Sequence, residues 1–190
     1  MPPLNSNVIP SNELKMSADP RDKLWEKSFS TYYDCYFEEM ISERLVYRWG
    51  MLDDITKVLV ALTASGSAIS GWALWNEPEF KIVWLFLAGL GAFLSIIHAS
   101  LNVQSRVKEW ENLKKDFTEL RVKIETFRHK MEINPQFDIN EFTKQYEEQR
   151  QMFSEIMKRI GGDITRTSKF QNDTQNDLNI KLADQIQNGE

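Results

Sequence analysis

The side chains that most often carry out chemistry are few and scattered in this sequence. Its two histidines, His98 and His129, lie far apart, and neither belongs to an HExxH pattern. The single cysteine, Cys35, has no histidine near it and sits in an aromatic segment, which is typical of a packed thiol. The glycines form no phosphate-binding loop, and adjacent carboxylates such as Glu38 and Glu39 point in different directions on a helix. We therefore expect no enzyme activity, no bound metal and no cofactor.

His98 belongs to an apolar region that dominates the hydropathy pattern of the chain. Residues 58–74 contain no charged side chain, and residues 82–101 contain no ionisable group other than His98. At about 1.5 Å per helical residue, each stretch nearly matches the roughly 30 Å hydrocarbon core of a bilayer. We predict a transmembrane hairpin with spans at 55–75 and 82–101, joined by an outward turn at 76–81. The alternative, a buried hairpin in a soluble protein, needs a far larger polar shell than this chain supplies.

Basic residues set the predicted orientation of this hairpin. The turn carries only Lys81, whereas both flanks are richer in basic residues. These flanking residues are Arg44, Arg48, Lys57, Arg106, Lys108, Lys114 and Lys115. The preference for positive loops on the inner side predicts cytoplasmic termini, and in a bacterium a multi-pass protein of the inner membrane. The single cysteine fits a reducing cytoplasm, and a net charge of −5 without a basic block argues against nucleic-acid binding.

Small residues recur at helical spacing in both predicted spans. Such residues allow membrane helices to approach closely, since lipid gives little hydrophobic drive between helices. The candidate packing residues are Ala61, Ala64, Ala68 and Gly71 in the first span and Ala88, Gly91, Ala92 and Ser95 in the second. They either pack the two helices of one hairpin together or hold neighbouring copies of the chain against one another.

A weakly polar stripe in the first span suggests an oligomeric pore. Thr63, Ser67 and Ser70 are its candidate pore-facing residues. Two helices cannot enclose a channel, so a pore requires several chains around a narrow aqueous path. Against this, serine and threonine hydroxyls also bond back to their own helix. His98 is a candidate gating residue, or alternatively it marks the polar transition at the membrane interface.

The sequence outside the hairpin predicts an all-α fold with a cytoplasmic helical bundle. A flexible segment, 1–18, precedes an amphipathic helix at 19–50 that is rich in aromatic residues, begins at an Asp19 cap and ends near Gly50. The second span continues as one long helix, the first arm of a helical hairpin at 102–160. That arm carries a coiled-coil seam of Trp110, Leu113, Phe117, Leu120, Ile124, Phe127 and Met131.

The second arm of this hairpin and the chain end complete the predicted bundle. Asp138 caps the last helix, with Glu141 as its capping-box partner. Gly161 and Gly162 end that helix, and residues 161–190, rich in asparagine, glutamine and aspartate, are typical of a polar flexible tail, with a short helix around 178–186 as an alternative.

This layout resembles the SLATT domains of bacteria, which are two-transmembrane effectors of nucleotide-linked defence systems. The resemblance covers about Leu24 to Ile160. An aromatic helix leads through Tyr36, Arg44 and Tyr47 into two closely spaced spans, followed by a long helical segment. It implies a pore-forming or membrane-disrupting effector without catalytic residues. It also implies a separate sensor or nucleotide-signalling protein as partner.

The leading hypothesis is therefore a homo-oligomeric membrane effector that opens a pore or disrupts the inner membrane in antiphage defence. The alternative is a membrane anchor or scaffold that docks a soluble partner through its cytoplasmic coiled coil. A phage holin ranks last, because two-span holins usually carry much less cytoplasmic mass.

Overall fold

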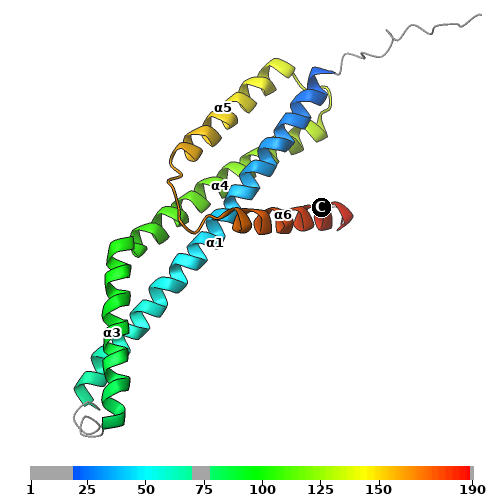
Figure 1. Ribbon diagram of the computed structural model, residues 1–190. Helices are drawn as coiled ribbons and strands as arrows, with labels where there is room; N and C mark the ends of the chain where they lie inside the picture. Colours follow the sequence, from blue (N-terminus) through cyan, green and yellow to red (C-terminus); the bar gives the residue numbers. More distant parts are fainter. Residues whose placement is uncertain (1–18, 70–77, 189–190) are drawn as a thin grey trace, which may run out of the picture.

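The computed structural model describes residues 19–69 and 78–188 of the chain. Within these ranges it describes the main chain but not the side chains of residues 62–69, 78–80, 84, 87, 88, 98, 186 and 188. The regular secondary structure of the described part is all α-helix, as predicted: α1 (Pro20–Ile69), α3 (Pro78–Leu101), α4 (Val103–Ile133), α5 (Ile139–Lys158) and α6 (Ser168–Asn188). Figure 1 shows α1 running the length of the molecule, beside α4 at one end and α3 at the other.

Helix α1 begins where the sequence predicts. The backbone N–H of Arg21 donates to the side chain of Asp19 at 2.9 Å, which satisfies one of the free donors at the helix start. The predicted end near Gly50 is wrong, because α1 continues without a break to Ile69. A glycine inside a helix costs only about 1 kcal/mol. Side chains on both sides of it, Trp49 and Asp53, are buried, and this packing outweighs the cost.

The bundle consists of the first half of α1 together with α4 and α5 (Figure 1). Its core is the seam predicted on α4. Each of the seven seam residues, the first being Trp110 and the last Met131, is at most 3 % exposed. Cys35, Ile41 and Leu45 of α1 pack into the same core. The Asp138 cap is also confirmed, since its side chain accepts from the backbone N–H of Asn140 at 2.9 Å. The predicted bundle is therefore present.

Asn102 separates two helices that the sequence predicted to be one. Its φ of 49° and ψ of 49° are left-handed, so α3 ends at Leu101 and α4 begins at Val103. Asparagine is one of the few residues that adopts this conformation readily. The chain changes direction at this point, between the α3 end of the molecule and the bundle (Figure 1).

The largest difference from the sequence prediction is at the end of the chain. Residues 168–188, expected to be part of a flexible tail with at most a short helix around 178–186, form helix α6, which packs against α1 (Figure 1). Phe170, Thr174 and Leu178, spaced four residues apart, are buried on one face of α6. Such a narrow stripe in an otherwise polar segment gives only a weak hydropathy signal for a helix. Tertiary contacts with α1 stabilise the helix.

Candidate functional site

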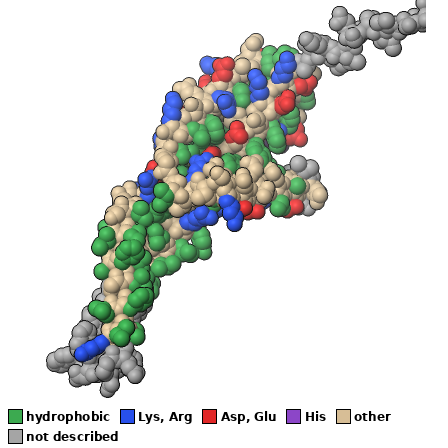
Figure 2. Space-filling model, viewed as in Figure 1, with side chains coloured by type: hydrophobic (Ala, Val, Ile, Leu, Met, Phe, Trp, Pro, Cys, Tyr) green, Lys and Arg blue, Asp and Glu red, His purple; other side chains and the backbone are tan. Residues whose placement is uncertain are grey.

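One candidate site is the stalk, which we define as α3 together with α1 from Ile55 onward. Its two helices pack against each other, yet their large apolar side chains are exposed in the single chain. These exposed residues are Ile55, Val58, Val60, Ile82, Val83, Leu85, Phe86, Phe93 and Ile96. Figure 2 shows apolar side chains gathered over the stalk, whereas charged side chains spread over the bundle.

The exposed residues of α3 lie mostly on one side of that helix. At 3.6 residues per turn, Ile82, Leu85, Phe86, Phe93 and Ile96 fall within about a third of the helical circumference. An exposed apolar face of this kind marks a surface that another apolar medium or partner covers. Within the residues described in full, no helix combines the length and the apolar character needed to cross a bilayer.

The predicted helix-packing residues divide into two groups where their side chains are described. Gly91 is buried, whereas Ala61, Ala92 and Ser95 are exposed in the single chain. The hydroxyl of Ser95 donates to the carbonyl of Gly91 at 2.8 Å. The side chains of Ala64, Ala68 and Ala88 lie outside the described set, as does Gly71 altogether.

The predicted pore-facing residues fall where the structure gives no side chains. Thr63 and Ser67 belong to α1, but only their main chain is described, and Ser70 lies outside the described residues. The side chain of the candidate gating residue, His98, is likewise outside that set. Thr56, two helical turns before Thr63 on α1, is buried and donates to the carbonyl of Leu52 at 2.8 Å.

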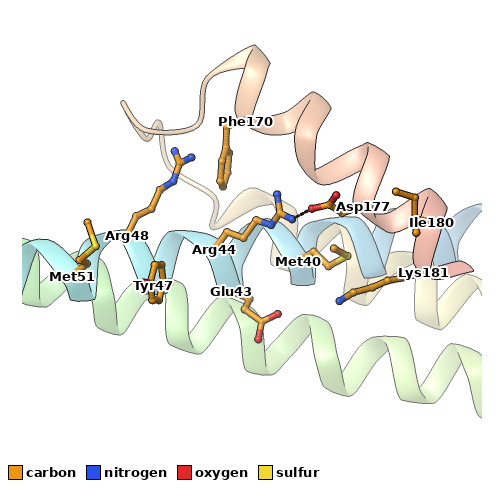
Figure 3. Close-up of a pocket in the computed structure, with 10 residues that line it drawn as sticks. All are labelled: Met40, Glu43, Arg44, Tyr47, Arg48, Met51, Phe170, Asp177, Ile180 and Lys181. Atoms are coloured by element: carbon orange, nitrogen blue, oxygen red, sulfur yellow. Dashed lines mark hydrogen bonds and ion pairs between the residues drawn. The ribbon is translucent and has the colours of Figure 1, made fainter.

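A second candidate site, which the sequence did not reveal, is a groove between α1 and α6. It has a volume of about 870 Å³, and Figure 3 shows side chains from both helices around it. The buried Met40 and Phe170 form part of its floor, and the exposed Tyr47, Met51 and Ile180 lie along its rim. The groove exists only because residues 168–188 form α6. The sequence did not predict this helix, so it did not predict the groove.

Charged residues of the groove differ in their partners. Arg44 donates to Thr174 at 3.1 Å and forms an ion pair with Asp177 (Figure 3). Glu43 pairs with Lys114 of α4 at 2.8 Å. In contrast, the guanidinium of Arg48 lies 4.1 Å from the centre of the Phe170 ring and donates to a backbone carbonyl.

Asp163 joins the loop before α6 to two helices of the bundle. Its carboxylate accepts from the indole N–H of Trp49 at 2.9 Å and of Trp110 at 2.8 Å. It also accepts from the hydroxyl of Thr165 at 2.6 Å and from the backbone N–H of the same residue at 2.8 Å. Partial burial alone would raise the pKa of Asp163, but these hydrogen bonds outweigh it and hold the pKa below its ordinary value.

A buried ion pair makes a second connection to the same loop. Glu38 of α1 is buried, and one of its carboxylate oxygens accepts from Arg166 at 2.6 Å. Burial raises the pKa of Glu38, and the positive charge of Arg166 opposes this rise in part. Together with Asp163, this pair fixes the start of α6 against α1 and so shapes the groove.

The side chains that the sequence offered for chemistry, such as Cys35, do not form a reactive site in the described part of the chain. Cys35 is buried in the core, and burial, with the nearby carboxylate of Glu39, raises the pKa of its thiol to about 12. A thiol with such a pKa is rarely a thiolate at neutral pH and is therefore a poor nucleophile. Within the described ranges, no three histidine, cysteine or acidic side chains are grouped to hold a metal ion.

Comparison with family models, curated proteins and solved structures finds no match to this chain. The resemblance to SLATT domains stays an expectation drawn from the sequence.

Proposed function

We propose that the chain is a membrane protein whose stalk lies in lipid, with spans at 55–75 and 82–101 that form a hairpin. The single observation that carries this proposal is the exposure of large apolar side chains along both stalk helices. The two charge-free stretches of the sequence, 58–74 and 82–101, extend into residues outside the set described in full. In water this surface would cost roughly 25 cal/mol for each Å² of apolar area, whereas lipid removes that cost.

The basic residues at the bundle end of the stalk support an orientation with both termini in the cytoplasm. Lys81 alone marks the turn, while Arg106 and Lys108 follow the second span within a few residues. By the positive-inside preference the bundle is cytoplasmic, and in a bacterium the stalk crosses the inner membrane.

We further propose that several copies assemble through the stalk. One hairpin has only two helices, and two helices cannot enclose an aqueous path. Ala92, Ser95 and Ala99 lie three and four residues apart on α3 and are exposed in the single chain, so they are free to meet a neighbouring copy. The assembly opens a pore or disrupts the bilayer, in line with the SLATT resemblance, and acts as an effector in antiphage defence.

The bundle gives this effector a rigid cytoplasmic part that can receive a signal from a sensor or nucleotide-signalling protein. The rival function, a membrane anchor that docks a partner through its coiled coil, faces a physical obstacle. The seam of α4 is already filled by α1 and α5 of the same chain. A docking partner would therefore need another surface.

Reconstitution into dye-loaded vesicles tests the proposed function. The wild-type chain should cross-link into oligomers and release the dye. Replacing Ala92 and Ser95 with leucine should leave insertion intact. It should abolish both the cross-linked oligomers and the dye release, since larger side chains separate the helices. The matched control is Val83→Leu with Ile96→Leu. The first change enlarges a side chain and the second changes its shape, both outside the small-residue face of α3, so this variant should behave as wild type.

Two results would overturn the proposal. A wild-type chain that remains monomeric in cross-linked membranes cannot form a channel, and insertion without oligomers would favour the anchor. Induced expression in cells should also depolarise the membrane, and an unchanged membrane potential with the trigger present would count against a pore.

A further inference from the structure

A continuous exposed apolar stripe on α1 links the groove to the stalk. Tyr47, Met51, Ile55 and Val58 are 71 %, 51 %, 45 % and 58 % exposed. Their spacing of four, four and three residues places them on one face of the helix. Tyr47 and Met51 line the groove between α1 and α6, whereas Ile55 and Val58 belong to the stalk. The groove therefore opens onto the surface that we assign to lipid.

The groove also carries positive charge without a carboxylate partner. Arg48 and Lys181 both line it and are both exposed. Among the described residues neither forms an ion pair with an acidic side chain. The acidic groups of the groove are engaged elsewhere, Glu43 with Lys114 and Asp177 with Arg44. The two cations lie at opposite ends of the groove, with the Arg44–Asp177 pair between them (Figure 3). An anion entering at the stalk end would thus meet Arg48 with little competition.

We propose that this groove binds an anionic phospholipid, an inference that rests on the proposed membrane hairpin. The phosphate lies against Arg48, beside Met51 at the stalk end of the groove (Figure 3), and an acyl chain follows Met51, Ile55 and Val58 toward the bilayer. Arg48 precedes Ile55 by about 10 Å along the helix, at about 1.5 Å per residue. The headgroup layer extends roughly 5–8 Å beyond the hydrocarbon core. The long side chain of an arginine covers the difference by reaching toward the interface.

Two other occupants fit the groove less well. A second copy of the chain, meeting this groove with its own, would bring cations against cations. A soluble anion would satisfy Arg48 but would leave Met51 and Ile55 exposed to water. A phospholipid satisfies both the charge and the apolar stripe, and it holds α6 to the membrane-proximal part of α1.

Native mass spectrometry of the purified full-length chain in non-ionic detergent tests this proposal. The chain is titrated with phosphatidylglycerol or with phosphatidylcholine of the same acyl chains. Wild type should retain phosphatidylglycerol preferentially. Arg48→Gln should weaken this retention about fivefold, because each basic residue at the membrane surface contributes measurably to anionic-lipid binding.

Matched variants separate binding from folding. Arg150→Gln removes the same kind of charge from an exposed position on α5 and should retain phosphatidylglycerol as wild type does. Arg48→Lys keeps the charge and should also bind, which shows that loss of stacking on Phe170 is not the cause. Met51→Gln should weaken retention through the apolar stripe alone, leaving both cations in place.

Several outcomes would overturn the inference. Equal retention of the two lipids by wild type, or unchanged retention by Arg48→Gln, would place the lipid elsewhere. Competition by glycerol phosphate at the same concentration as the lipid would indicate a soluble-anion site. Cross-linking between Met51→Cys copies that phosphatidylglycerol does not reduce would indicate a second copy. Alkaline extraction of membranes carrying each variant tests the hairpin separately, so failure here leaves the proposed function standing.

Discussion

The two ends of α1 lie in opposite surroundings although they belong to one continuous helix. In the bundle its large apolar residues, such as Ile41 and Leu45, are buried among those of α4. In the stalk residues of similar type, such as Ile55 and Val58, are exposed beside α3. Bundle side chains around this core form ion pairs and hydrogen bonds between helices, as Arg121 does with Glu39 at 2.5 Å. The difference teaches that apolar residues are hidden from water by protein at one end and, in our proposal, by lipid at the other.

The largest expected effect comes from cutting a large side chain out of the bundle core. Phe117→Ala should destabilise the bundle by about 3–5 kcal/mol, because it leaves a cavity in a fully buried site. Phe93→Ala, the same change on the exposed face of the stalk, should cost the bundle about 0.5 kcal/mol or less. Denaturant unfolding in detergent, followed by circular dichroism, measures both. Equal losses would mean that the two regions do not differ as described.

A charged residue should affect equally exposed positions differently in the two regions. Leu85 in the stalk is 77 % exposed and Ile133 at the end of α4 is 69 % exposed. Leu85→Arg should disfavour insertion, though by less than the roughly 2.5–3.5 kcal/mol that an arginine costs at the centre of a membrane helix, because Leu85 lies one turn inside the span. Ile133→Arg should have no effect on insertion, because its side chain is already in water. The fraction of each variant that resists alkaline extraction gives the comparison, and two unchanged fractions would contradict a lipid-facing stalk.

The junction between bundle and groove depends on Asp163. Asp163→Asn should cost about 2 kcal/mol, because an amide cannot accept from Trp49, Trp110 and Thr165 together. Asp173→Asn, an exposed change on α6, serves as the matched control and should be neutral. Thermal unfolding of the two variants at neutral pH measures the difference.

The contribution of Asp163 should also depend on pH. Folding holds the pKa of Asp163 below its ordinary value of 3.8, so the folded state binds its proton less readily. The stabilisation is therefore complete above that value and is lost as pH falls through the lower pKa of the folded state. The difference in stability between wild type and Asp163→Asn should shrink in strong acid. A constant difference across this pH range would mean that the carboxylate charge is not responsible.

The sequence predicts the parts of the molecule in which periodicity is strong. The seam of α4 repeats over several turns, and every residue named in it is buried, because a long apolar stripe on a helix must be covered. Asp19 and Asp138 cap helices as expected, since this depends on local chemistry alone.

Tertiary packing decides the parts that the sequence did not predict. Gly50 lies inside a helix rather than ending one, and Asn102 breaks a helix that appeared continuous. Helix α6 owes its position to contacts such as Glu38 with Arg166, which join residues far apart in the chain. The groove escaped prediction for the same reason, because Arg48 and Phe170 come together only when α6 packs on α1.

Cysteine labelling in native membranes tests the lipid-facing stalk most directly. Cys35, the only cysteine of the chain, is buried, so it gives little background reaction with a water-soluble maleimide. In open membrane fragments, Ile133→Cys should react rapidly, and Leu85→Cys should react only after detergent is added. Equal rates for the two cysteines before detergent would contradict the account, because the stalk would then face water.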